Sequence, residues 1–349
     1  MAGKVMLWPS VRSKFIKEEN MKLIYRVLLV LSAIMVVQNV YLYGLVYGVK
    51  LALMVLVSII LTRETEILFY THDKDINRLE AKELIKKSYP EMMAVIFALL
   101  IPIGTPLWLV GLGAVLATLL GKLLFGGFHH MIFHGSIVGV ILVTLGWQQL
   151  VSGVSFATSF DNYILTIIFD NNFFNQTLHL GGIFDPQTMS SALDLLNDGT
   201  PYGLGKLFFG LTPGVIASGF VLLLTFAFLL FKKAINYMVP TVAIVAFLLT
   251  TLLLNQFDVS YTLYYLFSGS FLFVAIFAMT DPITTPVPLA GKIIFGVVVG
   301  ALTVFIRQAQ VYEEGVIFAL LFMNMLTPML NEIFKEKKAP VKKVVKENE

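Results

Sequence analysis

The chain has 349 residues and a net charge of +3; 57% of its residues are apolar, 13% are charged, and its mean hydropathy is +0.83. This balance excludes a soluble globular protein, because most of the surface must face lipid rather than water. Cysteine is absent, which excludes disulfides, cysteine-bound zinc and any iron–sulfur cluster held by this chain itself.

Apolar runs near 20 residues recur along the chain, and such runs have the length needed to cross about 30 Å of hydrocarbon as helices. The first run has no small-residue cleavage site after it, which is typical of a retained anchor rather than a signal peptide. We therefore expect an all-α integral membrane protein in the lipid bilayer. The pattern predicts ten transmembrane helices, over residues 23–45, 47–67, 91–104, 106–121, 134–150, 212–231, 236–254, 261–279, 290–306 and 314–330.

Lys and Arg divide unevenly between the two sides of these spans. If the N-terminus is cytoplasmic, all of the 25 Lys and Arg residues except Lys50, Lys206 and Arg307 fall on the cytoplasmic side. Cytoplasmic loops accumulate positive charge. We therefore expect both termini in the cytoplasm of a prokaryotic cell, with the protein in its inner or plasma membrane. The long loop lacks Lys and Arg between residues 122 and 206, so it is expected outside.

The chain divides at this loop into two groups of spans. The predicted parts are a cytoplasmic N-terminal segment over residues 1–22, a first five-helix half over 23–150, an extracytoplasmic loop over 151–211, a second five-helix half over 212–330 and a cytoplasmic charged tail over 331–349. The tail reads KEKKAPVKKVVKENE and is interpreted as a solvated segment, so no nucleic-acid partner is expected.

A short pattern occurs once in each half. Residues 96–106 read IFALLIPIGTP, and residues 276–286 read IFAMTDPITTP, 180 residues later. The first copy ends an outward span and the second ends an inward span, which indicates two halves of inverted topology. Pro and Gly break both helices, and broken backbone is tolerated at membrane depth only where it lines a cavity or a ligand. The alternative is that Pro-Thr-Pro is only a common helix stop.

Hydroxyl residues cluster in the outer loop, in the segment DPQTMSSALDLLNDG that begins at Asp185. Residue chemistry alone favours a helix-capping segment, because Ser or Thr before SALDLL would cap a short helix. An external enzyme could also reach the hydroxyls, which are Thr188, Ser190 and Ser191.

Three segments carry a resemblance to a known family. They are GSFLFVAIFAMTDPITTPVPLAGKIIFGVVVGALTVFIRQAQVYEEGVIFALLFMNMLTPML at residues 269–330, GKLLFGGFHHMIFHGSIVGV at 121–140 and PSVRSK at 9–14. The chain resembles the RnfD/NqrB family, membrane subunits of the Rnf complex and of sodium-translocating NADH:quinone reductase. Its length and the TDPIT and LTVFIR segments place it closer to RnfD.

The resemblance implies a covalent flavin on the outer loop. In this family a D-x-x-S/T-x-A-T segment carries FMN in phosphoester linkage to its last hydroxyl, added by a flavin transferase. Asp185 and Thr188 match, whereas Ser190 replaces the usual Ala and Ser191 replaces the usual Thr. We expect covalent FMN at Ser191. A rival match, SFAT at residues 155–158, lacks the leading Asp.

The resemblance also implies a noncovalent riboflavin within the helices. The residues expected to line it are Asp281, Thr284 and Thr285 in one broken-helix segment, with Lys122 and Gly126 in another. A flavin ring needs apolar walls and a few placed polar partners. The histidines of the HHxxxH segment at 129–134 are interpreted as polar packing near the cofactor rather than as metal ligands, because the family usually has Gly, Gln and Asn there.

The function implied by the resemblance is a redox-driven ion pump that connects ferredoxin and NAD. This subunit would relay electrons between flavins, with the other membrane and flavin or iron–sulfur subunits of the complex as partners, and would catalyse nothing alone. Two alternatives stay open. One is a channel or transporter on the same architecture that has lost its flavin; the other is a purely structural member of the complex.

Overall fold

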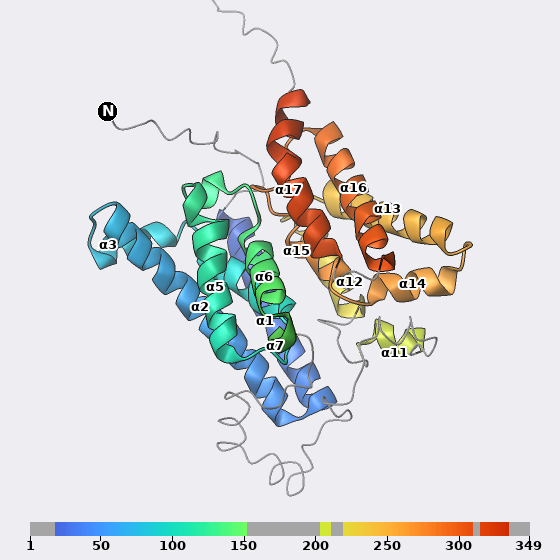
Figure 1. Ribbon diagram of the computed structural model, residues 1–349, viewed down its shortest axis with the longest axis horizontal. Helices are drawn as coiled ribbons and strands as arrows, with labels where there is room; N and C mark the ends of the chain where they lie inside the picture. The colour runs from blue at the N-terminus through green and yellow to red at the C-terminus, as the bar shows by residue number, and fades with distance from the viewer. Residues whose placement is uncertain (1–17, 152–202, 211–218, 310–314, 335–349) are drawn as a thin grey trace, which may run out of the picture.

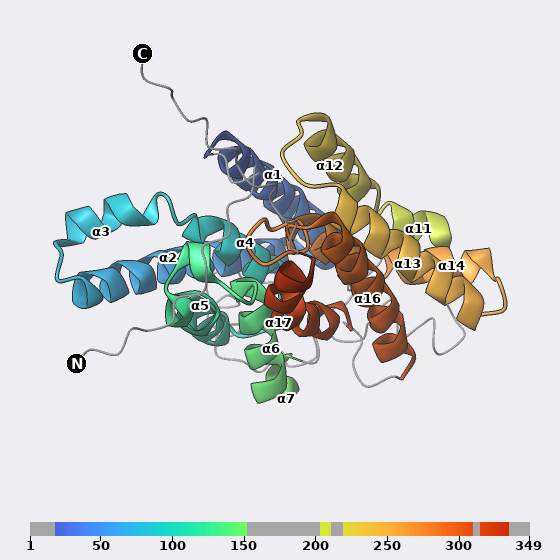
Figure 2. The same ribbon diagram turned by 90° about the horizontal axis from the view of Figure 1, so that it is seen from above.

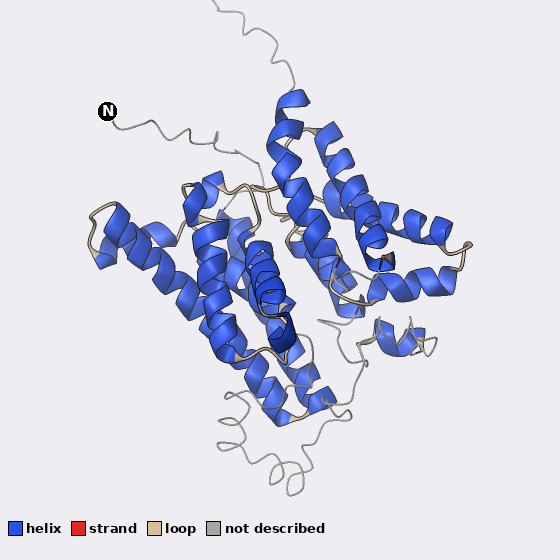
Figure 3. Cartoon of the chain, in the orientation of Figure 1, coloured by secondary structure: helices blue, strands red, loops and turns tan. Residues whose placement is uncertain are grey.

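The structure, a computed structural model, describes residues 18–151, 203–210, 219–309 and 315–334. In these ranges it is built of helices without strands (Figure 3), as expected from the apolar runs. The first part contains α1 (Glu18–Tyr43), α2 (Leu45–Asp73), α3 (Arg78–Ile85), α4 (Pro90–Leu100), α5 (Leu107–Gly121), α6 (Gly135–Gly146) and α7 (Gln148–Val151). The second contains α11 (Leu204–Phe208), α12 (Gly219–Phe231), α13 (Met238–Leu254), α14 (Val259–Phe267), α15 (Phe271–Phe277), α16 (Leu289–Gln308) and α17 (Val316–Ile333).

Five of the described helices are long and apolar enough to cross a membrane, which makes this a multi-pass membrane protein. They are α1, α2, α5 with the turn that follows it, α16 and α17. The pair α14 and α15 counts as a sixth span if it crosses as one unit, and α4, α6, α12 and α13 are shorter apolar helices. These elements lie where the sequence predicts spans, but the number of complete crossings stays a prediction.

Two predicted spans differ from the observed helices. The helix expected over 91–104 is α4, which has 11 residues and a length of about 16 Å, roughly half of the hydrocarbon thickness. The single helix expected over 261–279 is wrong, because α14 and α15 meet at an angle of 60°. Gly269 has a φ of 70° at this corner, a left-handed conformation that glycine adopts without steric cost.

Both copies of the repeated pattern end a helix. α4 ends at Leu100, two residues before Pro102, and α15 ends at Phe277, before the turn that holds Pro282. Proline lacks the amide hydrogen that a helix needs and disfavours helical geometry in the preceding residue. Each broken segment is followed by a long helix, α5 or α16, as Figure 1 shows.

The two groups of helices pack side by side, with the first on the left of Figure 1 and the second on the right. They meet where α17 contacts α6, and both views place α6 beside α17 (Figure 2). The buried apolar core runs continuously through both groups. α3 was not predicted from the sequence. It follows the end of α2 and buries Ala81 and Ile85 against Ile67 of α2.

Close packing of α5 on α6 depends on two glycines. A Cβ atom added at Gly121, the last residue of α5, would collide with the Cα atom of Gly135 in α6. We expect Gly121→Ala to destabilise the protein by about 1–3 kcal/mol, the usual cost of overpacking. The matched control is Gly146→Ala at the last residue of α6, where an added Cβ atom would come within 4 Å of no atom outside its own stretch of helix. Thermal midpoints of the detergent-solubilised variants measure the difference, and equal midpoints would contradict this packing.

Candidate functional site

Two of the residues predicted to face a cofactor, Lys122 and Asp281, line the same pocket although they lie 159 positions apart. The pocket lies between the two groups of helices. Its walls come from the start of α1, the α3–α4 junction, the segment between α5 and α6, and the end of α15. The lining residues are Met21, Ile24, Ser88, Tyr89, Met92, Met93, Ile96, Lys122, Phe128, Met131, His134, Gly135, Phe277, Thr280, Asp281 and Pro282.

Lys122 anchors the polar side of this pocket. Its side chain is 1% exposed, and its ammonium group forms a buried ion pair with Glu66 of α2, whose side chain is fully buried. The Lys122 Nζ also donates to the carbonyl oxygen of Ser88 at 2.8 Å, and the Ser88 hydroxyl donates to Glu66 Oε2 at 2.6 Å. The cluster Glu66–Ser88–Lys122 therefore joins α2, the α3–α4 junction and the end of α5.

Tyr89 shapes the wall next to this cluster. Its φ of 48° is left-handed, which is rare for a bulky residue and stores backbone strain at the start of α4. Its ring lies 5.8 Å from the ring of Phe128, and the Lys122 ammonium lies 5.4 Å from the centre of that same Phe128 ring. Burial raises the pKa of the Tyr89 hydroxyl. The Phe128 ring thus gives the Lys122 ammonium a second favourable contact, on the side that faces the pocket.

Asp281 is half-buried and organises the turn after α15. One carboxylate oxygen accepts a hydrogen bond from the Thr284 hydroxyl at 2.9 Å, and the backbone carbonyl of Asp281 accepts one from the Thr285 hydroxyl at 2.7 Å. Thr327 of α17 donates to the Thr284 carbonyl at 3.0 Å. Thr284 and Thr285 are predicted site residues, but here they hold the turn and do not line the pocket.

The remaining predicted residues lie farther from the pocket or outside the described parts of the chain. Gly126 closes the turn after α5 with a φ of 100° and does not line the pocket. His134 does line it, and its Nδ1 atom finds no hydrogen-bond partner among the described residues. The predicted covalent flavin segment, with Asp185, Thr188, Ser190 and Ser191, lies outside the described residues.

The pocket has the residue types of a flavin site, because apolar side chains form its walls and two charged groups converge on it. Its volume is about 40 Å³, whereas pockets for small organic ligands usually have about 300–1,000 Å³. A three-ring isoalloxazine does not fit into this space, so no step is assigned to riboflavin here. Binding the ring would require Tyr89, Phe128 and their neighbours to move apart.

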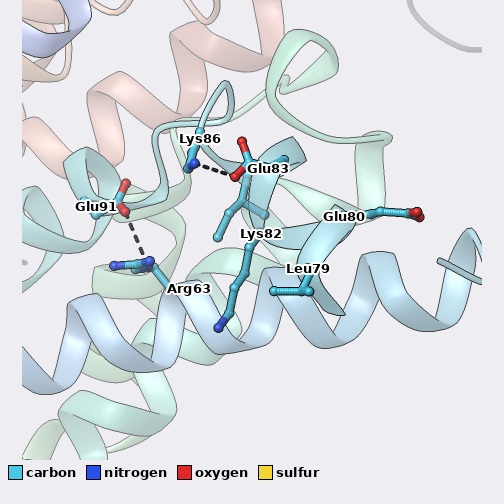
Figure 4. A pocket seen from close by; sticks show the side chains of 8 residues that line it. Arg63, Leu79, Glu80, Lys82, Glu83, Lys86 and Glu91 are labelled. Atoms are coloured by element: carbon cyan, nitrogen blue, oxygen red, sulfur yellow. Dashed lines mark hydrogen bonds and ion pairs between the residues drawn. The ribbon is translucent and has the colours of Figure 1, made fainter. Parts of the chain in front are cut away.

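A larger groove of about 360 Å³ lies between α2, α3 and the start of α4 (Figure 4). It contains none of the predicted site residues. Its charges are partly paired, with Arg63 3.4 Å from Glu91 and Lys86 2.5 Å from Glu83; Glu91 is half-buried, and the other three side chains are exposed. Exposed ion pairs of this kind are typical of a solvated surface, so the smaller buried pocket is the better candidate site.

A second buried cation occupies a related position in the other half. Arg307, at the end of α16, is 2% exposed and donates to the carbonyl oxygens of Tyr265 at 2.9 Å and Ser268 at 3.3 Å. It lies 5.3 Å from the Tyr265 ring centre and 5.5 Å from that of Phe247. Ser268 precedes the broken helix α15 as Ser88 precedes α4, and the two serines are 180 positions apart, the spacing of the repeated pattern.

A family model and several curated relatives match this chain over most of its length. The family model described as "NQR2, RnfD, RnfE family" matches residues 11–339. The chain is 27% identical over 270 residues to the D subunit of the ion-translocating oxidoreductase complex of Actinobacillus succinogenes, covering 69% of this chain and 74% of the relative. It is 28% identical over 264 residues to the protein of the same name from Haemophilus influenzae strain KW20, covering 69% and 74%. The Buchnera aphidicola protein of that name is 27% identical over 269 residues, covering 70% and 75%.

The buried ion pair gives a test of the site's energetics. We expect Glu66→Gln to destabilise the protein by about 3–5 kcal/mol, because it leaves the Lys122 charge buried without its counter-ion. The double variant Glu66→Gln/Lys122→Met removes both charges and should recover most of this loss. In the exposed pair of Arg78 with Glu64, Glu64→Gln should cost less than about 1 kcal/mol. Thermal unfolding of these variants and Lys122→Met measures the coupling, and additive losses would contradict a buried charge pair.

Proposed function

Since the chain belongs to the NQR2, RnfD, RnfE family, we propose that it is the flavin-carrying membrane subunit of an ion-translocating ferredoxin:NAD oxidoreductase complex. The relatives, each named as the D subunit of an ion-translocating oxidoreductase complex, support the membership in such a complex. In this proposal the chain relays electrons across the membrane, and their passage is coupled to transport of Na⁺ or H⁺. Its partners are the other membrane, flavin and iron–sulfur subunits, and a flavin transferase matures it.

The observation that carries this proposal is the meeting of Lys122 and Asp281 at one buried pocket between the two groups of helices. Buried charged groups inside a membrane protein are costly and mark functional paths. Riboflavin remains part of the proposal, as a ligand that enters this pocket only when its walls separate. Covalent FMN at Ser191 is its second flavin, proposed from the match of the loop segment to the family pattern.

We also propose that the two halves are inverted repeats. Both copies of the pattern end a helix, and each broken helix is preceded by a serine whose carbonyl accepts a hydrogen bond from a buried cation, Lys122 or Arg307. Both cations come from the end of the long helix that follows the break. This correspondence supports a common architecture in opposite orientations. The Lys and Arg residues gathered at both ends of the chain support the proposed position of both termini in the cytoplasm.

A transporter-like or structural family member without covalent flavin is the second candidate. The observation in its favour is the replacement of the usual Ala-Thr ending by Ser190-Ser191. Serine keeps the nucleophilic hydroxyl and lacks one methyl group, so the phosphoester bond is chemically available. The two candidates differ in whether flavin stays attached to the denatured chain.

The covalent flavin is tested in protein produced together with its native flavin transferase. We expect the denatured band to fluoresce under ultraviolet light, and Ser191→Ala to abolish this fluorescence because the attachment oxygen is gone. Ser190→Ala and Thr158→Ala are the controls and should keep it. A dark band from the unmodified chain would favour the second candidate, and peptide mass mapping of residues 177–206 locates the flavin if the band is bright.

The orientation is tested with single cysteines, because the chain contains none. Lys74 follows α2 and Lys206 lies in α11, and both side chains are exposed. In intact cells, a membrane-impermeant maleimide should label Lys206→Cys directly and Lys74→Cys only after the membrane is opened. Labelling of both before opening, or the reverse order, would contradict the proposed topology.

A further inference from the structure

The larger groove, between α2, α3 and the start of α4, opens where two apolar helices leave the hydrocarbon layer of the membrane (Figure 4). On α2, Leu56 and Ile60 are 52% and 49% exposed, and Arg63, on the same face, is the first exposed charged residue of the helix. Its Nε atom lies 3.4 Å from a carboxylate oxygen of Glu91, in the first turn of α4. Charged residues at the ends of apolar helices lie at the level of the lipid head groups, so the groove opens at that level.

α3 presents a face of mixed character to this groove. Leu79, Lys82 and Lys86 follow one another at spacings of three and four residues, so they lie on one side of the helix, and all three line the groove. Leu79 is 76% exposed, whereas Ala81 and Ile85 are buried against α2. Apolar and cationic side chains on one short helix are typical of a segment that lies at a membrane surface.

One cation of the groove has no counter-ion. Lys82 forms no ion pair within the ranges that the structure describes, whereas Arg63 and Lys86 are each paired with a carboxylate. Figure 4 shows the Lys82 side chain extending from α3 toward α2, the helix that carries Arg63. A guanidinium and an ammonium group on facing helices are suited to hold one phosphate group between them.

Carboxylates also line the groove, from Glu80, Glu83 and Glu91. They would repel a ligand that carries negative charge alone, but they would attract a ligand that carries a cation beside its phosphate. Glu91 is the least exposed charged side chain of the groove, at 26%, so it gains most from such a cation. The volume of about 360 Å³ lies within the range of pockets for small organic groups.

We propose that this groove binds the head group of one phospholipid that carries a phosphate and a primary ammonium, as phosphatidylethanolamine does. The phosphate lies between Arg63 and Lys82, and the ammonium lies beside the Glu91 carboxylate. One acyl chain follows the exposed apolar side chains of Leu56 and Ile60 along α2.

The bound lipid connects α2 to the start of α4 from outside the helices. Glu91 lies two residues after Tyr89, whose backbone is strained, and three after Ser88, which bonds to the buried ion pair. A ligand that binds only the folded chain stabilises it by mass action. The lipid should therefore raise the thermal midpoint of the chain, and this effect depends neither on a flavin nor on electron transfer.

The first experiment is native mass spectrometry of the detergent-solubilised full chain, titrated with phosphatidylethanolamine, phosphatidylglycerol or phosphatidylcholine of identical acyl chains. We expect the first phosphatidylethanolamine to bind about tenfold more tightly than either of the others, the effect of one charge-assisted contact. Phosphatidylglycerol lacks the ammonium, and the choline group donates no N–H hydrogen bond. Equal binding of all three lipids, which indicates acyl chains alone, or tighter binding of phosphatidylglycerol would overturn the inference.

The same titration is made with variants. Arg63→Gln/Lys82→Gln should weaken binding of the first phosphatidylethanolamine about tenfold and abolish the rise of the thermal midpoint. Lys74→Gln/Lys232→Gln is the matched control, because it removes two exposed cations that do not line the groove and should leave both measurements unchanged. Unchanged binding in the first variant, or equal losses in the two, would overturn the inference.

The second experiment keeps every charged residue and uses single cysteines in lipid nanodiscs. Leu79 lines the groove, whereas Leu84, also exposed on α3, does not. Adding phosphatidylethanolamine to phosphatidylcholine nanodiscs should slow the reaction of Leu79→Cys with a water-soluble methanethiosulfonate severalfold, because the bound head group covers the groove. The rate for Leu84→Cys should stay the same. No slowing of Leu79→Cys, or equal slowing of both cysteines, would overturn the inference.

Discussion

The pairing of the Lys122 ammonium with the Glu66 carboxylate is the interaction on which the site depends. Removing two charged groups from water costs free energy. Their mutual attraction offsets this cost only when the geometry is good and the remaining hydrogen-bond positions are filled. Here Ser88 fills them, with its carbonyl on Lys122 and its hydroxyl on Glu66. This requirement explains why the α3–α4 junction stays close to the end of α5, and why Tyr89 tolerates a strained left-handed backbone between Ser88 and the start of α4.

The same constraint applies to the other breaks in the helices. Backbone carbonyls freed inside a membrane must find donors, because lipid offers none. Lys50 donates to the carbonyl of Gly104 at 3.2 Å, next to the break after α4, and Arg307 donates to the carbonyl of Ser268 at the corner between α14 and α15. These buried cations are thus placed at broken segments, and their long side chains connect each break to a continuous helix.

Much of this arrangement could be predicted from the sequence, for identifiable reasons. Apolar length predicted the helical elements, and Pro102 and Pro282 predicted that a helix breaks near each of them, because proline acts locally. The exact ends were not predicted, since the span over 91–104 continued past Pro102 whereas α4 ends at Leu100. Lys122 and Asp281 were both expected at one site, and they do line one pocket. The corner at Gly269 and the short length of α4 were missed, since hydropathy does not distinguish one span from two half-length helices. Glu66 was missed although it lies inside the span predicted over residues 47–67, because only Lys and Arg were used to assign the two sides; an acid within an apolar span was the available signal.

The pocket that holds Lys122 and Asp281 lies between the two groups of helices, and the proposed function requires its walls to separate around a flavin ring. Electron cryomicroscopy of the assembled complex, produced in the presence of riboflavin, tests this requirement most directly. We expect flavin density between Tyr89, Phe128 and Asp281, with the contact between Lys122 and Glu66 retained. A map without flavin density in this pocket, and with its walls as close together as they are here, would contradict the proposed function.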